Sequence, residues 1–214
     1  IFKIYFFFTL ILNFMREILN KKLNNNIISI WEYFPGEIDI KKLNLSKSVK
    51  YRIKLISSEK KQKEHAVTSI ILNKIFKSKV DLWHNSSGKP FINKSKNISI
   101  SHSNNYIAIA YGEKNIGIDI ERPQNRIINV CKKILSKKEI DILSHYPNKI
   151  NACKFWSAKE AIFKFFGEKN INFKNDIDCS DFNSSVCNKK EFKIFFEYIN
   201  DYIVTYCLRK TTLN

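Results

Sequence analysis

Glycine, proline and histidine are scarce in this chain of 214 residues, and methionine occurs once, at Met15. With five glycines and four prolines, the sequence is neither fibrous nor of low complexity. Four histidines argue against a metal site built from a histidine cluster. Apolar residues make up 44% of the chain, which is enough for one well-buried core or for two small lobes that share an interface.

Cysteine is also infrequent, and its pattern bears on redox state. The five cysteines are an odd number and include no C-x-x-C pair. This argues against a complete disulfide framework and against a zinc site of the usual spacing. We interpret them as reduced thiols and expect the protein to be cytoplasmic.

No apolar run reaches the roughly 20 residues of a membrane-spanning helix. Residues 1–14 (IFKIYFFFTLILNF) are nearly all apolar but too short, and no small-residue cleavage site of a signal peptide follows them. We expect translation to begin at Met15 and residues 1–14 to be an upstream or non-native extension, with a remnant membrane anchor as the alternative. We expect no stable membrane association.

Acidic residues are outnumbered, with 20 against 37 lysines and arginines and a net charge of +17. Such an excess predicts an anionic partner. The accompanying bias toward Lys, Asn, Ile and Phe is equally typical of an AT-rich genome, and solvated lysines also keep a protein soluble. Charge alone therefore does not identify a function.

The hydrophobic periodicity predicts a mixture of helices and strands. A capping box at Ser136 and Glu139 marks one helix start, and Gly167 closes another helix. The expected strands and hairpins are 27–34, 97–112, 116–121 and 191–209, and the expected helices lie within 47–76, 135–143 and 150–167.

Two pairs of segments recur at one spacing. The hairpin turns at Asn104 and Asn200 are 96 positions apart, as are the Lys-Glu pairs at 63–64 and 159–160, where we expect two helices to begin. The shared spacing predicts two related halves, near 27–114 and 115–209, although the identities are few enough for chance. A site where the halves meet would follow.

Asp119 and Glu121 lie two apart in the strand GIDIE, so both side chains point to one face while Ile118 and Ile120 point to the other. Two neighbouring carboxylates repel, and a hard divalent cation with oxygen ligands is the natural charge to place between them. The alternative is an edge strand whose acids pair with lysines or Arg122.

A second group of candidate site residues lies on the helix that ends at Gly167. Trp156, Glu160 and Lys164 follow one another at spacings of four, which places them on one face. Glu160 and Lys164 taken alone are as typical of an ordinary surface ion pair. In the hairpin, Ser101 and Ser103 share a face and His102 points the other way; a lone histidine is usually structural.

Four segments in fixed order carry a resemblance: GKP (88–90), SISHS (99–103), GIDIE (117–121) and WSAKEAIFK (156–164). Together they resemble the 4′-phosphopantetheinyl transferases, specifically the Sfp type named for the surfactin-synthetase activator. In the short trimeric holo-acyl-carrier-protein synthases, the serine-histidine element comes last instead of first. The resemblance implies an α+β fold of two similar lobes related by a pseudo-two-fold axis, here 15–114 and 115–214.

The resemblance also implies a reaction. The phosphopantetheine arm of coenzyme A would move to a serine of an apo acyl or peptidyl carrier protein, with Mg²⁺ as cofactor and adenosine 3′,5′-bisphosphate as the other product. Members of the family are expected to act as monomers without a nucleic-acid partner. Another Mg²⁺-dependent enzyme on phosphates, such as a nuclease, and a basic nucleic-acid-binding module are the competing functions.

Site residues follow by similarity, position by position. Asp119 and Glu121 would be metal ligands, and Glu160 would be either a third ligand or the base that takes the serine proton. Lys164, and with it Lys159, would face the pyrophosphate. The positions that would hold the phosphates of coenzyme A are Lys89, Ser101, His102, Lys47 and Lys50. The chain departs from the family after the helix, where GEKN follows with Gly167 as its only glycine.

Overall fold

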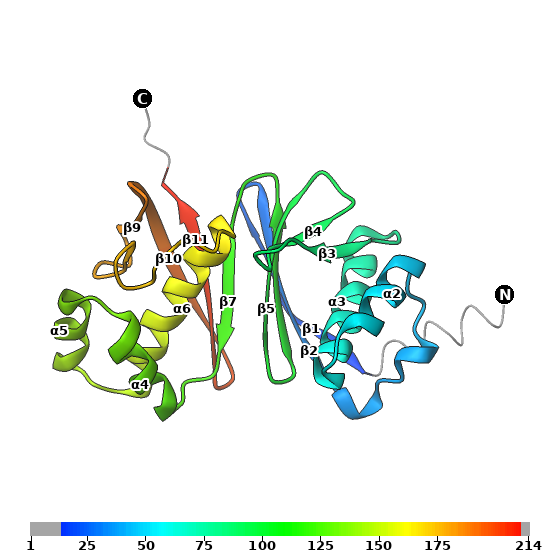
Figure 1. Ribbon diagram of the computed structural model, residues 1–214, viewed down its shortest axis with the longest axis horizontal. Coiled ribbons are helices and arrows are strands. Elements are labelled where there is room, and N and C mark those ends of the chain that lie inside the picture. Colours follow the sequence, from blue (N-terminus) through cyan, green and yellow to red (C-terminus); the bar gives the residue numbers. More distant parts are fainter. Residues whose placement is uncertain (1–13, 211–214) are drawn as a thin grey trace.

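The computed structural model describes residues 14–210, so most of the apolar segment 1–14 lies outside the described residues. The fold is α+β and has four layers (Figure 1). Two antiparallel sheets lie face to face in the middle, and each has its helices on its outer face. None of the helices within 14–210 combines the length and the apolar character needed to cross a membrane.

The first sheet has the strand order β1-β2-β6-β5, and every neighbouring pair is antiparallel. Two helices cover its outer face, and a small separate hairpin, β3-β4, follows them. The strands are β1 (Met15–Leu23), β2 (Asn26–Tyr33), β3 (Leu82–His84), β4 (Pro90–Ile92), β5 (Asn97–Ser103) and β6 (Tyr106–Gly112), and the helices are η1 (Pro35–Glu37), η2 (Ile40–Lys42), α2 (Lys47–Leu55) and α3 (Glu59–Phe76).

The second sheet has the order β7-β11-β10-β9-β8, again with antiparallel neighbours. Three helices cover its outer face, and the last of them packs along β7 and β11. The strands are β7 (Gly117–Glu121), β8 (Ile177–Asp178), β9 (Ser185–Cys187), β10 (Lys190–Ile199) and β11 (Tyr202–Arg209), and the helices are α4 (Asn125–Ile134), α5 (Lys137–His145) and α6 (Lys149–Phe166).

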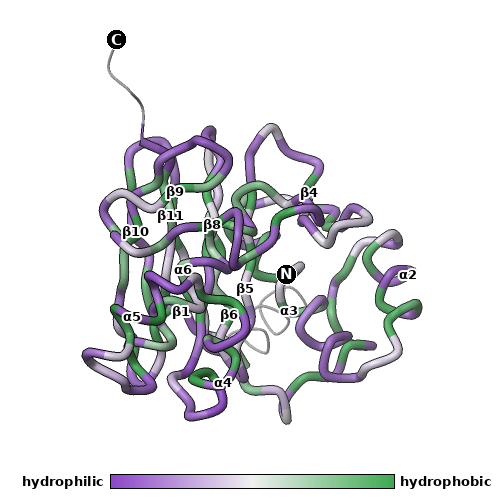
Figure 2. Tube along the Cα trace, turned by 60° about the vertical axis from the view of Figure 1, so that its left-hand side comes forward, coloured by the Kyte–Doolittle hydropathy of each residue, from purple (hydrophilic) through white to green (hydrophobic). Residues whose placement is uncertain are grey.

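Alternation along the strands divides the core into three clusters. In β2, Ile28 and Ile30 face the opposite sheet, whereas Trp31 and Tyr33 belong to the core beneath α2 and α3. A third cluster fills the space between the second sheet and α4 to α6. The loops at the strand ends are mostly hydrophilic (Figure 2). Both sheets are thus buried on two faces, so polar functional groups are expected at the edges of the sheets and at the ends of their strands.

The two hairpin turns meet between the sheets. Asn104 and Asn200 both adopt the left-handed conformation, with φ of 50° and 52°. The Asn104 side-chain amide donates to the Tyr202 hydroxyl at 2.7 Å, and the Asn200 amide donates to the Tyr106 hydroxyl at 2.7 Å. The two tyrosine rings are 4.5 Å apart between centroids. The hairpins therefore contact each other reciprocally.

Several local predictions are confirmed and others are wrong. Both hairpins form, and both hydrogen bonds of the capping box at Ser136 and Glu139 are present. The helical segment 47–76 breaks at 56–58 into α2 and α3. The helices begin at Glu59 and Lys149, not at 63 and 159, so the spacing of 96 holds for the hairpins and fails for the helices. The strand β1, the hairpin β3-β4, α4 and the short strands β8 and β9 were not predicted.

Candidate active site

The two acids of β7 share one face of the strand, as their spacing predicts, and this face lies against α6. Ile118 and Ile120 lie in the core between the sheets, while Asp119 is 4% exposed on the other face. The close approach of β7 to α6 requires the glycine before them, since a Cβ on Gly117 would lie 1.8 Å from the carbonyl oxygen of Ala161. The strand therefore brings its carboxylates directly against the helix.

Asp119 Oδ1 is the acceptor of two hydrogen bonds that join three elements. Ser101 Oγ on β5 donates to it at 2.7 Å, and Lys164 Nζ on α6 donates to it at 2.7 Å. Lys164 Nζ also lies 2.8 Å from Ser101 Oγ. The lysine thus sits beside the acid rather than away from it, and its charge compensates one of the carboxylates in this group.

Glu160 and Glu121 complete a group of three interacting carboxylates. Burial raises the pKa of Glu160 to about 7, with Lys164 opposing the rise and the charges of Asp119 and Glu121 adding to it. Burial and the neighbouring Asp119 also raise the pKa of Glu121. A carboxyl with a pKa near neutrality can both accept and release a proton at physiological pH.

The group has the chemistry of a divalent-cation site but is not a closed cage. Asp119 Oδ2 is buried and has no hydrogen-bond partner among the described residues 14–210, so a strong acceptor points into the group unsatisfied. Within residues 14–210, no three side chains from His, Cys, Asp and Glu are arranged to hold a metal ion on their own. Mg²⁺ usually binds one or two carboxylates together with water and substrate phosphate, so the oxygen donors fit that ion.

Opposite the acids lies a group of four basic side chains that the sequence analysis missed, except for His102. The rings of His65 and His84 are 5.9 Å apart, and His102 Nε2 lies 2.9 Å from Thr68 Oγ1. Burial is the largest cause that lowers the pKa of His65, to about 4, and of His102, to about 3. Burial and the charge of Arg52 lower the pKa of His84.

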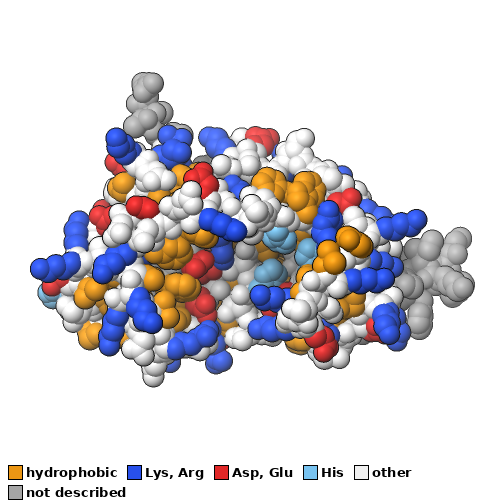
Figure 3. All heavy atoms as spheres, in the orientation of Figure 1, with side chains coloured by type: hydrophobic (Ala, Val, Ile, Leu, Met, Phe, Trp, Pro, Cys, Tyr) orange, Lys and Arg blue, Asp and Glu red, His pale blue; other side chains and the backbone are white. Residues whose placement is uncertain are grey.

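Two nitrogen atoms in this basic group lack a hydrogen-bond partner. Arg52 Nη1, which is a donor, and His65 Nε2 are buried and unpaired among residues 14–210. In Figure 3 histidine side chains lie in the hollow at the middle of the molecule, with acidic side chains beside them across the hollow. An anion with several oxygen atoms would accept from Arg52 Nη1, and also from His65 Nε2 when that nitrogen carries the ring proton, since burying such groups unpaired is costly. No sequence spacing signals this group, because its members come from α2, α3, β3 and β5.

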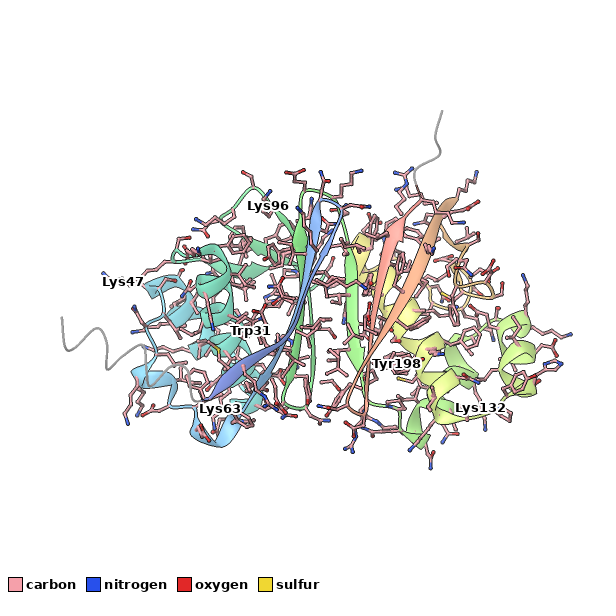
Figure 4. The ribbon with its side chains drawn as sticks, turned by 180° about the vertical axis from the view of Figure 1, so that it is seen from behind. Trp31, Lys47, Lys63, Lys96, Lys132 and Tyr198 are labelled. Atoms are coloured by element: carbon pink, nitrogen blue, oxygen red, sulfur yellow. The ribbon has the colours of Figure 1, made fainter. Side chains whose placement is uncertain are left out.

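The other predicted phosphate contacts lie elsewhere. Lys47 and Lys50 are both exposed, and Lys47 is at the outer edge of the molecule (Figure 4). On the same helix, Arg52 is the basic residue near the histidines. Lys89 Nζ donates to the carbonyls of Phe165 and Phe166 at 3.2 Å each, so it caps the end of α6 from the other sheet's side.

Lys159 differs most from its predicted position. We expected it near the phosphates, but its side chain is fully buried and pairs with Glu139, with 2.8 Å between Nζ and Oε2. Its ammonium group also donates to the carbonyls of Phe173 and Ile177. The cause is helical geometry, because residues 159 and 160 point about 100° apart around α6, so only one of them can face the hollow.

Comparison with known proteins agrees with the motifs. Residues 115–207 match the family model of the 4′-phosphopantetheinyl transferase superfamily. A 4′-phosphopantetheinyl transferase of Bacillus subtilis is 34% identical over 86 residues, which are 38% of this chain and 38% of that protein. The 4′-phosphopantetheinyl transferase gsp of Aneurinibacillus migulanus is 29% identical over 87 residues, 39% of this chain and 37% of that protein.

The matched region contains β7 and α6, and so all three carboxylates and Lys164. The match spans less than two-fifths of the length of these curated relatives. Residues 115–207 therefore carry the similarity to the 4′-phosphopantetheinyl transferase superfamily, and this agrees with the motifs that precede them.

Proposed function

We propose that this chain transfers the 4′-phosphopantetheine group of coenzyme A to a serine of an apo acyl or peptidyl carrier protein, as a holo-acyl-carrier-protein synthase. One observation carries the proposal. Within the region that matches the superfamily, the carboxylates of β7 and α6 gather around Lys164, and they face a group of basic side chains with two unpaired nitrogen atoms. Cation-binding acids opposite anion-binding bases suit a substrate that carries several phosphates.

The acidic group is the proposed Mg²⁺ site. Asp119, through its free Oδ2, and Glu121 are the proposed ligands, with Glu160 as a third ligand or as the base. Bound there, Mg²⁺ would neutralise the pyrophosphate and the charge that develops on the leaving phosphate. The same ion would relieve the repulsion among three carboxylates that Lys164 compensates only in part.

The chain's own residues account for proton transfer and positioning. The carrier serine oxygen forms a bond to the phosphorus next to the pantetheine arm, and the bond from this phosphorus to the bridging oxygen breaks, which releases adenosine 3′,5′-bisphosphate. The serine proton goes to the Glu160 carboxylate, directly or through a water, and a pKa of about 7 suits that role. The Lys164 ammonium group stabilises negative charge on the pyrophosphate.

Coenzyme A is proposed to lie with its phosphates along the basic group. His102 and Ser101 are retained as contacts, and Arg52, His65 and His84 are added because two of these residues carry buried nitrogen atoms without a hydrogen-bond partner. Lys89 already caps α6, so it would contribute through its backbone or by releasing the cap. Lys47 and Lys50, both exposed, would contribute only long-range attraction.

We also propose the pseudo-two-fold arrangement and its lobes, 15–114 and 115–214. The strand orders β2-β6-β5 and β7-β11-β10 correspond element by element, and the reciprocal contacts of Asn104 and Asn200 have the form of a two-fold contact. Such a fused pair would act as a monomer. A cytoplasmic location is proposed from the five buried, unpaired cysteines.

One assay tests the reaction. The protein is incubated with coenzyme A, Mg²⁺ and an apo acyl carrier protein, and the carrier is weighed by mass spectrometry. A mass gain of one phosphopantetheine that disappears with EDTA and with a carrier whose modified serine is replaced by alanine is expected. An unchanged carrier overturns the proposal, and degradation of added nucleic acid under the same conditions would establish the nuclease alternative.

A further inference from the structure

A fully buried ion pair lies behind the proposed site, on the side of α6 that faces away from it. Lys159 and Glu139 each have a side-chain exposure of 0%, and their charged atoms are 2.8 Å apart. Glu139 lies at the start of α5, and Lys159 directly precedes Glu160 on α6. The pair thus connects the neighbour of a proposed catalytic residue to a different element.

Every hydrogen-bonding group of the pair is engaged. Lys159 Nζ donates to the Phe173 carbonyl at 2.7 Å, to the Ile177 carbonyl at 2.5 Å and to Glu139. Glu139 Oε1 accepts from the backbone N–H of Cys179 at 2.7 Å, and Oε2 accepts from that of Ser136 at 2.7 Å. The network therefore holds α6, the start of α5 and the segment 173–179 in one arrangement.

Stability alone is a weak reason for such a pair. A buried ion pair loses its hydration on both sides, and apolar residues of similar volume often give an equal or more stable fold. A saturated network does give one defined geometry, because any rotation of α6 breaks several bonds together. The site on the opposite face of α6 requires one fixed rotation of this helix, because Glu160 and Lys164 must contact Asp119, which lies on β7.

We propose that Lys159 and Glu139 are positioning residues, which fix the rotation of α6 so that Glu160 and Lys164 face the hollow. The proposal rests on the proposed transferase function for its kinetic test. It assigns the lysine of the W-x-x-K-E segment to the framework of the helix rather than to the phosphates. Neither residue is expected to contact coenzyme A or the carrier.

The test replaces the charged pair by uncharged residues of similar shape. In Glu139→Gln/Lys159→Met no buried charge remains, and the glutamine keeps an acceptor for the Cys179 N–H. We expect a folded protein whose kcat is at least tenfold lower, with KM for coenzyme A within about twofold of wild type. Glu139→Asp keeps the buried charge of the acid but shortens its side chain. This variant should lower kcat at least threefold, and it tests the proposal where the double variant does not fold.

A matched control separates positioning from general destabilisation. Ile194→Ala removes a buried side chain of β10 in the same core without touching the network, and should lower the melting temperature while kcat stays within about twofold. Folded variants of the pair with wild-type kcat would overturn the proposal.

A second readout does not need activity. Hydrogen exchange followed by mass spectrometry should show faster exchange of the amides in 159–166 and 173–179 in the double variant than in Ile194→Ala. Equal exchange in both overturns the positioning role. If wild type transfers nothing to any carrier, the proposed function fails, and the exchange data still decide this inference.

Discussion

Asp119 has one oxygen engaged and one free, and this asymmetry defines the proposed site. Oδ1 accepts from Ser101 and Lys164, while Oδ2 is buried without a partner. A carboxylate that served only as half of an ion pair would have both oxygens satisfied or solvated. The unsatisfied oxygen makes Asp119 the strongest candidate for a cation ligand among the three acids.

The carboxylates should be essential to turnover but not to folding. We expect Asp119→Asn and Glu160→Gln each to lower kcat/KM at least about 100-fold, because the first weakens cation binding and the second removes the proton acceptor. Melting temperatures should stay close to wild type, and Glu113→Gln, at an exposed acid, should retain full activity. Carrier mass spectrometry measures the rates, and a near-normal rate for either site variant contradicts the assignment.

Buried histidines should make the fold sensitive to acid. The pKa of His65 is about 4 when folded and about 6.5 when unfolded, so below pH 6.5 the unfolded chain binds a proton that the folded chain does not. Stability present above pH 6.5 is therefore lost as the pH falls through 4, by roughly 3 kcal/mol for this group at about 1.4 kcal/mol per unit. The charges of Arg52, Lys60 and Lys164 and the other histidines act in the same direction.

Urea unfolding at pH 7 and pH 4.5 measures this effect. Carboxylates also titrate over this range, so the comparison is between variants. His65→Gln should show a smaller loss of unfolding free energy between the two pH values than wild type does. His145→Gln, at an exposed histidine, should lose as much unfolding free energy as wild type does. The prediction would be contradicted if His65→Gln lost as much unfolding free energy between the two pH values as wild type.

The short distance between β7 and α6 depends on Gly117, which has no side chain. We expect Gly117→Ala to destabilise the protein by about 3 kcal/mol or more, because the added Cβ would overlap the Ala161 carbonyl and neither backbone can move without disturbing the core. Gly36→Ala is the matched control, since no atom lies within 4 Å of its Cβ position. Urea unfolding compares them, and equal stability of the two variants would show that β7 can shift.

Elements with a strong local pattern were predictable, and those defined by distant contacts were not. The hairpins, β7 and the end of α6 at Gly167 follow from alternation, turn residues and a left-handed cap. The strand β1 could not be predicted from its local pattern, because its residues Arg16–Leu23 are exposed or half-buried and its partner β2 supplies the apolar face. The helix pattern placed α6 at 150–167, within one residue of its observed bounds, whereas the repeat placed a helix start at 159, inside α6.

The site was predictable to a similar degree. Spacing placed Asp119 and Glu121 on one face of a strand and Glu160 and Lys164 on one face of a helix, and the resemblance to the family implied that these faces meet. Spacing could not reveal that Lys159 has a buried partner 20 residues away at Glu139, since nothing local distinguishes it from Lys164. Arg52, His65 and His84 were missed for the same reason, because each comes from a different element.

At the scale of the whole molecule, the four layers place the site between a group of acidic side chains and a group formed by histidines and Arg52. The acids come from β7 and α6 of one sheet and its helices, and the histidines and Arg52 come from the other sheet's helices and strands. Ser101 crosses between them to Asp119. Neither half carries the complete group, so the activity that we propose depends on the contact between the sheets.

That contact gives a prediction about the whole molecule. If the halves are related by a pseudo-two-fold, the equivalent bonds from Asn104 to Tyr202 and from Asn200 to Tyr106 should contribute about equally, since their lengths and settings agree. Glycine is the suitable replacement, because both asparagines have positive φ and alanine would add backbone strain. We expect Asn104→Gly and Asn200→Gly each to lower the free energy of unfolding by about 1 kcal/mol.

The double variant tests whether the two bonds form one contact. Both bonds lie at the same pair of contacting tyrosines, so their effects should be coupled rather than additive, with the second replacement costing less once the first has loosened the turns. Urea unfolding of the two single variants and the double variant completes the cycle. Strongly unequal single effects, with one near zero, would mean that the two hairpins are not equivalent and that the resemblance of the halves is confined to their strand order.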